Sequence, residues 1–185
     1  MIRLLDRNQE ILDMLQTERF FLKEIQPTEI QLIYKGLSDP QVYQYYGVRF
    51  LTLEATKEQM EWYEMLKETG TGIWFGIYDK VDDAFCGAGG YNNLEKEHQK
   101  AEIGFWLYPA YWGKGILSEV MPKLLEYGFE ELDLNRIEGF VENDNSKCKK
   151  ALAKINFRLE GTMRQAEFKN GKWIDVDIYA KLKNQ

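Results

Sequence analysis

The chain has few of the residues on which metal sites and disulfide frameworks depend. It contains two cysteines and one histidine in 185 residues. Cys86 and Cys148 show no pairing pattern, and His98 stands among Glu, Lys and Gln, as a solvated histidine does. The sequence therefore predicts no metal site and no disulfide framework, and it favours a reducing, cytoplasmic compartment.

Long apolar runs and an excess of positive charge are also missing. No run approaches the ~18 apolar residues of a membrane span, and residues 1–16 carry charges throughout and lack a signal-peptide core. The formal net charge of −6 argues against direct binding to nucleic acid and favours cationic substrates such as amines. With 44% hydrophobic residues, the chain is expected to fold as a single domain over residues 1–185, with residues 1–16 as an N-terminal extension.

The hydrophobic pattern predicts a mixed α/β (α+β) fold. Strands are expected at residues 18–26, 73–80, 84–92, 101–108, 136–142, 157–168 and 173–182. Caps at Thr28, Thr56 and Asp144–Ser146 predict helix starts, and Gly70 predicts a helix end. The three middle strands follow one another without a helix and predict an antiparallel meander. A helix separates 101–108 from 136–142, which makes those two strands parallel.

One stretch joins a strand to a helix through a glycine-rich turn. Residues 101–108 end at Pro109, and Tyr111-Trp112-Gly113-Lys114-Gly115 follows as a tight turn. A helix begins after it, with one apolar face formed by Leu117, Val120, Met121, Leu124 and Leu125. Glycines let a backbone approach a ligand closely, a helix N-terminus carries partial positive charge, and Lys114 adds a full charge. The stretch therefore predicts a binding site for phosphate.

Two common phosphate motifs match this turn poorly. A P-loop needs Ser or Thr after its lysine, but Gly115 follows Lys114. A dinucleotide fingerprint would run from Gly113 to Ser118, with Ser118 where the third glycine or alanine belongs. That motif should also begin a run of alternating strands and helices, whereas three successive strands precede this turn.

The turn is similar to the pyrophosphate turn of the GNAT acetyltransferases, written Gln/Arg-x-x-Gly-x-Gly/Ala. Trp112 stands in the place of Gln or Arg, and Leu117 in the place of the last small residue. The closest resemblance is to the branch containing the ribosomal-protein N-acetyltransferases, in which Trp-Gly-Lys-Gly is followed by Ser-Glu. Further stretches extend the resemblance over residues 17–182: TERFFLKEI, AEIGFWLYP, RIEGFVEN, NSKCKKALAKINFRLEGTMR and NGKWIDVDIYAKL.

The resemblance implies a fold and a donor substrate. It implies a central, mostly antiparallel sheet flanked by helices, whose fourth and fifth strands (residues 101–108 and 136–142) splay apart to admit acetyl-CoA, without a metal. The pantetheine arm would pair with the fourth strand, and the pyrophosphate would meet the N–H groups of residues 113–118. The residues expected to bind acetyl-CoA are Phe105, Trp106, Leu107, Trp112, Gly113, Lys114, Gly115, Ile116, Leu117, Ser118, Asn145 and Lys150. Lys150 belongs to a run with Lys147, Lys149 and Lys154 that is otherwise a solvated helix face.

The resemblance also suggests catalytic residues. Glu102 matches an acidic position on the fourth strand and is the candidate base, acting through a water; the alternative is a carboxylate paired with a lysine. A backbone N–H near Phe105 or Trp106 would stabilise the oxyanion. Cys148 stands where this branch has Ser and a proton donor, although it shares an apolar helix face with Leu152. Asn145 is a helix cap, a ligand, or both.

The sequence does not identify the acceptor of the acetyl group. The leading hypothesis is a protein N-terminal α-amine, such as that of a ribosomal protein. The alternatives are a small amine (a polyamine, an amino acid or an antibiotic) or an inactive domain that binds CoA as a sensor. No nucleic-acid or membrane partner is expected, and the chain is expected to be a monomer or a homodimer. Specificity would lie in residues 28–70, which contain no motif.

Overall fold

A computed structural model describes residues 15–185. Residues 1–14 of the expected N-terminal extension lie outside the described residues. The strands are β1 (Leu15–Gln16), β2 (Phe20–Glu24), β3 (Ile73–Asp79), β4 (Phe85–Glu95), β5 (Lys100–Leu107), β6 (Arg136–Glu142), β7 (Arg158–Lys169) and β8 (Lys172–Leu182). The helices are η1 (Pro27–Glu29), α2 (Ile30–Leu37), α3 (Pro40–Tyr43), α4 (Lys57–Thr69), η2 (Pro109–Tyr111), α5 (Ile116–Glu130) and α6 (Ser146–Lys154).

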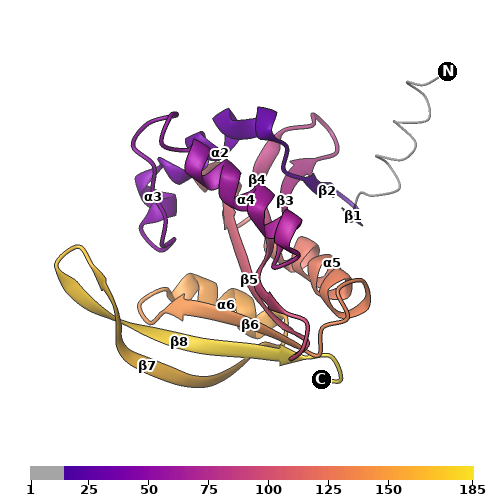
Figure 1. Ribbon diagram of the computed structural model, residues 1–185, viewed down its shortest axis with the longest axis vertical. Coiled ribbons are helices and arrows are strands. Elements are labelled where there is room, and N and C mark those ends of the chain that lie inside the picture. Colours follow the sequence, from indigo (N-terminus) through magenta and orange to yellow (C-terminus); the bar gives the residue numbers. More distant parts are fainter. Residues whose placement is uncertain (1–14) are drawn as a thin grey trace.

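The strands form one sheet in the order β1-β2-β3-β4-β5-β6-β8-β7. Only the β5–β6 pair is parallel, so the predicted mixed, mostly antiparallel sheet is confirmed. The β5–β6 pairing covers three positions and ends at Glu102↔Glu138. Beyond that position the two strands separate, and Figure 1 shows them running apart from their shared end. The splay of the fourth and fifth predicted strands is therefore present.

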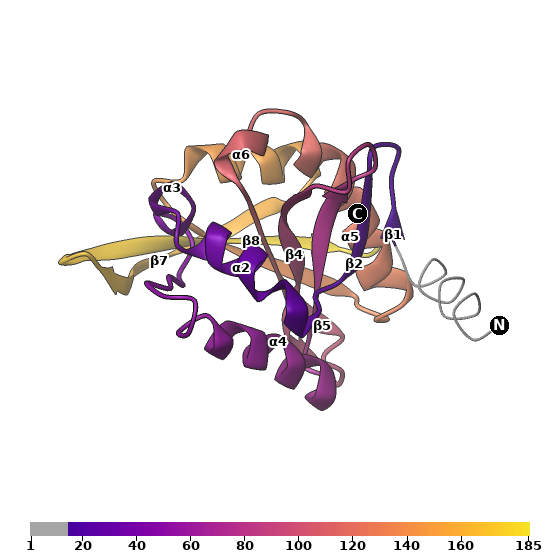
Figure 2. The same ribbon diagram turned by 90° about the horizontal axis from the view of Figure 1, so that it is seen from above.

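Two apolar clusters cover the two faces of the sheet. Val120 and Leu124 of α5 pack with Ile103 of β5 in one cluster. In the other, Leu37 of α2 and Leu66 of α4 pack with buried aromatic side chains of β3, β4 and β5. Figure 2 shows α4 and α6 on opposite sides of the sheet. In residues 15–185, no helix is long and apolar enough to cross a membrane.

Local signals placed most elements correctly, with three corrections. Leu15–Gln16, expected to belong to the N-terminal extension, pairs as a short strand with β2. Thr28 is not a cap, because the chain turns into η1 one residue earlier and Glu29 accepts the backbone N–H of Gln26 at 2.8 Å. Thr56 precedes α4 as predicted, but its hydroxyl donates to the carbonyl of Thr52 at 3.0 Å and caps nothing.

Candidate active site

The splay leaves one edge of β5 without a partner strand. The N–H of Tyr108 donates to the carbonyl of Cys86 in β4 at 2.9 Å. Because backbone groups of alternate strand residues point to the same edge, the N–H of Trp106 also faces β4, and those of Phe105 and Leu107 face the edge on which β6 lies. Since β6 pairs only as far as Glu102, the backbone of Phe105 and Leu107 borders the gap.

This geometry separates the three strand residues predicted to bind the cofactor. Phe105 presents its N–H to the gap. The N–H of Trp106 faces β4, so it does not favour the predicted backbone contact with the cofactor. The side chain of Trp106 is buried against Phe85 and Tyr108. The carbonyl of Leu107 already accepts the indole N–H of Trp112 at 2.9 Å. Of the two N–H groups considered for the oxyanion, that of Phe105 is therefore the better placed.

The turn before α5 presents a run of unpaired donors. Gly113 and Gly115 have φ of +74° and +78°, a conformation that side chains disfavour. The first hydrogen bond of the helix runs from the N–H of Glu119 to the carbonyl of Gly115 at 3.2 Å. Within residues 15–185, the N–H groups of positions 113–118 donate to no backbone acceptor. Six donors at the start of a 15-residue helix form a strong potential site for an anion.

Glu102 lies at the apex of the gap, at the last position where β5 and β6 are paired. Its Oε2 accepts from Nδ2 of Asn92 at 2.9 Å. No lysine or arginine of the described chain forms an ion pair with Glu102, and neighbouring Lys100 pairs with Glu95 instead. The alternative interpretation of Glu102 as a lysine-paired carboxylate is therefore wrong.

A second carboxylate stands beside Glu102. Glu138 is its partner across the parallel β5–β6 pair. Ile137 and Val141 belong to the cluster under α5, so Glu138 faces the other side of the sheet, as Glu102 does. Its Oε1 accepts from Nε of Arg136 at 2.6 Å. Glu138 carries no signal in the sequence, and only the strand register brings it beside Glu102.

Aromatic residues cover the face of the sheet on which Glu102 lies. The ring of Trp74 lies so close to Gly104 that a Cβ there would be 2.7 Å from it. The indole N–H groups of Trp74 and Trp106 and the hydroxyl of Tyr63 are buried and have no hydrogen-bond partner among the described residues. These three polar groups therefore lie inside the cluster and are not exposed at its surface.

The start of α6 lies beside the turn that precedes α5, because Nζ of Lys147 is 5.4 Å from the centre of the Trp112 ring. Oδ1 of Asn145 accepts from the backbone N–H of Cys148 at 3.0 Å, so the predicted cap is confirmed. Cys148 packs against the cluster that contains Leu152, and burial raises the pKa of its thiol to about 12. The thiol is therefore protonated at neutral pH. Lys150 is exposed.

Lys149 does not belong to the solvated face predicted for this helix. Its Nζ lies 2.6 Å from Oδ2 of Asp177 on β8. Asp177 is 1% exposed and also accepts from Thr162 at 2.6 Å and Asn143 at 3.0 Å. Burial would raise the pKa of Asp177, but the bonds from Lys149, Thr162 and Asn143 outweigh burial and hold it below its usual value. This group, which was not predicted from the sequence, anchors α6 to the sheet.

Comparison with known proteins gives one family. A family model for an acetyltransferase (GNAT) domain matches residues 19–158. The uncharacterized N-acetyltransferase p20 of Bacillus licheniformis is 34% identical over 175 residues, which are 94% of this chain and 98% of that protein. The ribosomal-protein-serine acetyltransferase of Escherichia coli is 30% identical over 129 residues, 70% of this chain and 71% of that protein.

A solved structure shows the same fold. The spermidine N-acetyltransferase of Vibrio cholerae, in complex with CoA and spermine, superimposes with a TM-score of 0.81 at 20% identity. The match covers 90% of this chain and 96% of that chain.

Proposed function

Because this chain belongs to the GNAT acetyltransferase family, and is therefore an acetyl-CoA-dependent N-acetyltransferase, we propose that its acceptor is the α-amine at the N-terminus of a protein. The observation that carries this proposal is the position of Glu102 at the apex of the gap, between the open edge of β5 and β6. The amine would enter beside Glu102, and the thioester would lie along β5.

The residues around the gap and the turn fit the donor substrate. Acetyl-CoA supplies an activated acetyl thioester and carries an anionic pyrophosphate. The open edge at Phe105 and Leu107 suits the amide-rich pantetheine arm, and the free N–H groups of positions 113–118 suit the pyrophosphate. Lys150, exposed on α6, supplies a positive charge for the ribose phosphate. Trp112 borders the gap, since its indole N–H donates to the carbonyl of Leu107. Asn145 caps the end of α6 that lies beside Trp112, where Nζ of Lys147 is 5.4 Å from the ring centre.

Each catalytic requirement has a group of this chain near the gap. Glu102 takes the proton of the amine, through a water. The N–H of Phe105 stabilises the negative charge that develops on the carbonyl oxygen. The protonated thiol of Cys148 provides a proton for the departing thiolate, and Asn145 holds the turn of helix on which Cys148 lies.

The charge of the site favours an α-amine. Glu102, which forms no ion pair among the described residues, attracts a cationic acceptor to the apex, whereas the charge of Glu138 is compensated by its ion pair with Arg136. At pH 7 roughly a tenth of an α-amine with a pKa near 8 is neutral and able to attack, against on the order of one in a thousand for a lysine-type amine. The ribosomal-protein-serine acetyltransferase, which matches 70% of this chain, supports the same class of acceptor.

A panel of acceptors tests the proposal. Peptides with free N-terminal Ser, Ala or Met, the same peptides with a blocked N-terminus and one internal lysine, and spermidine are each incubated with acetyl-CoA. Free-thiol release gives the rate, and mass spectrometry gives the acetylated position. We expect the free N-terminal peptides to have kcat/KM at least tenfold above the blocked peptides and spermidine.

A polyamine is the second candidate, because the fold is shared with a spermidine N-acetyltransferase and the apex holds two carboxylates. Preference for spermidine over every peptide would overturn the N-terminal proposal in favour of this candidate. CoA binding without turnover of any amine would instead indicate a sensor.

A further inference from the structure

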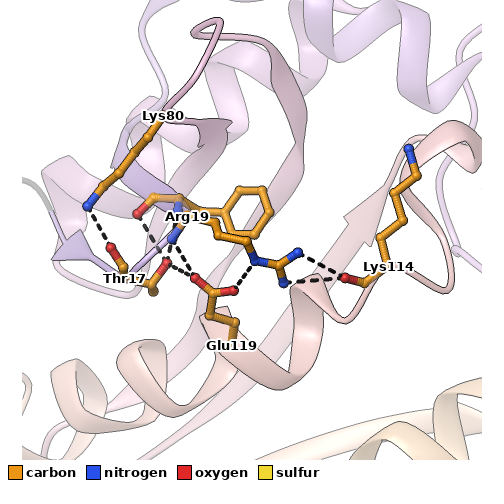
Figure 3. A network of polar contacts seen from close by, with 6 residues as sticks. Thr17, Arg19, Lys80, Lys114 and Glu119 are labelled. Atoms are coloured by element: carbon orange, nitrogen blue, oxygen red, sulfur yellow. Dashed lines mark hydrogen bonds and ion pairs between the residues drawn. The ribbon is translucent and has the colours of Figure 1, made fainter.

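Arg19, just before β2, reaches across to the turn that precedes α5. Its Nε lies 2.6 Å from Oε2 of Glu119, and its backbone N–H donates to Oε1 of Glu119 at 2.7 Å. Both terminal nitrogens of its guanidinium lie 3.3 Å from the carbonyl oxygen of Lys114. Thr17 adds a hydrogen bond to Oε1 of Glu119 at 2.7 Å. Figure 3 shows Arg19 between the carboxylate and the turn.

Glu119 is unfavourable for binding an anion. It is the acidic residue in the first turn of α5, next to the free N–H groups of positions 113–118. An unpaired carboxylate there would repel a pyrophosphate and compete with it for the same donors. Arg19 and Thr17 instead occupy both oxygens of Glu119. Although burial acts to raise the pKa of Glu119, the hydrogen bonds from Arg19 and Thr17 prevail and lower it, so the carboxylate is charged and committed to them.

Arg19 also determines the direction of one donor in the turn. In a trans peptide the C=O and the following N–H point in opposite directions. The guanidinium of Arg19 holds the carbonyl of Lys114, so the N–H of Gly115 points away from Arg19. Gly115 has a φ of +78°, and a Cβ added there would lie 3.7 Å from a terminal nitrogen of Arg19, so the guanidinium lies directly against this residue.

We propose that Arg19 is a positioning residue for the pyrophosphate of the donor substrate. It neutralises Glu119 and orients the Lys114–Gly115 peptide so that the turn presents its N–H groups to the anion. The inference rests on the proposed binding of acetyl-CoA at this turn, and it assigns no contact between Arg19 and the reacting atoms.

The test compares two donors that differ in the pyrophosphate. Acetyl-CoA carries the pyrophosphate, and S-acetylpantetheine lacks it but keeps the thioester. For Arg19→Met we expect KM for acetyl-CoA to rise about fivefold, the upper end of what an exposed charge near a helix N-terminus usually contributes. We expect kcat/KM for S-acetylpantetheine to stay within twofold, because the catalytic groups do not touch Arg19.

Three further variants separate the parts of the role. Arg19→Lys keeps a charge for Glu119 but cannot bridge to the carbonyl of Lys114, so KM for acetyl-CoA should fall between those of the wild type and Arg19→Met. Adding Glu119→Gln to Arg19→Met should recover part of the loss, because the unpaired carboxylate is gone. Lys123→Met removes a charge from an ion pair on the same helix and should leave the kinetics with both donors unchanged.

The outcomes distinguish this inference from the proposed function. An unchanged KM for acetyl-CoA in Arg19→Met, or an equal loss with both donors, would overturn the role of Arg19 while leaving acetyl transfer intact. A wild-type protein that binds CoA no more tightly than pantetheine by calorimetry would overturn the assignment of the turn, and the inference with it. The side chain of Arg19 is 48% exposed, so its replacement should cost little stability. Unfolding temperatures of all variants provide the check.

Discussion

Replacing Asp177 by asparagine should destabilise the protein by about 2–3 kcal/mol. The side chain is 2% exposed and loses its ion pair with Lys149, for which a charged hydrogen bond contributes about 1.5–3 kcal/mol. Thr162 and Asn143 both donate to Oδ1, so the amide oxygen can take that place, and the new NH2 group then faces the ammonium of Lys149, which contacts Oδ2 of Asp177. Breaking a fully buried ion pair costs about 3–5 kcal/mol, but Lys149 is 25% exposed and can turn to water, so the loss stays below that range.

The effect should be measured by thermal and urea unfolding. For a chain of this length, a loss of about 2–3 kcal/mol corresponds to a fall in Tm of roughly 4–12 °C. Lys149→Met is the matched variant, because it leaves Asp177 buried with its two neutral donors. The double variant should show that the two losses are not additive, since both remove one interaction.

The stabilisation by Asp177 should also depend on pH, and the lowered pKa of its carboxyl group gives the direction. The pKa of Asp177 is lower in the folded protein than its ordinary value of about 3.9. A carboxyl group whose pKa is lowered by folding stabilises the protein. This stabilisation is complete above the pKa of the unfolded state and is lost as the pH falls through the pKa of the folded state. The gap in unfolding free energy between wild type and Asp177→Asn should therefore shrink as the pH falls below about 4. A gap that widens on acidification, or a loss below about 0.5 kcal/mol at pH 7, would refute the buried pair as a source of stability.

Three further predictions concern the site. Gly115→Val should weaken CoA binding at least tenfold by calorimetry. Gly171→Val, which replaces a glycine with the same φ of +78° in the β7–β8 turn, should leave CoA binding unchanged. Equal affinities of the two variants for CoA would refute the assignment of the pyrophosphate turn. Glu102→Gln should lower kcat/KM by ~10²–10⁴ at pH 7, and raising the pH to 9 should recover about tenfold, because an α-amine of pKa near 8 is by then mostly neutral; a wild-type rate at pH 7 would make Glu102 structural. Cys148→Ala should lower kcat by about 10²-fold at most, because a thiol whose pKa burial raises to about 12 is a reluctant donor; equal activity in the two proteins would leave Cys148 as packing.

The amino-acid sequence alone determined the local features of this protein. Alternating apolar residues marked the strands, because a two-residue period places one face of each strand in a core. Gly113 and Gly115 marked the turn, and both adopt the positive φ that favours glycine. Asn145 marked the start of α6, because a cap is a contact between a side chain and a backbone group three residues away. Thr28 and Thr56 show the limit of such signals, since neighbouring residues offered competing hydrogen bonds.

The tertiary structure decided which distant residues meet. Glu138 joins Glu102 through strand register, and Asp177 joins Lys149 through the packing of α6 on the sheet. Arg19 joins Glu119 across 100 residues of chain. No periodic pattern in the sequence predicts these pairings, because each depends on how strands align and separate after the chain has folded. The extent of the gap beyond Glu102 has the same origin: it is set by where β5 and β6 stop sharing hydrogen bonds, and neither strand's own sequence encodes that position.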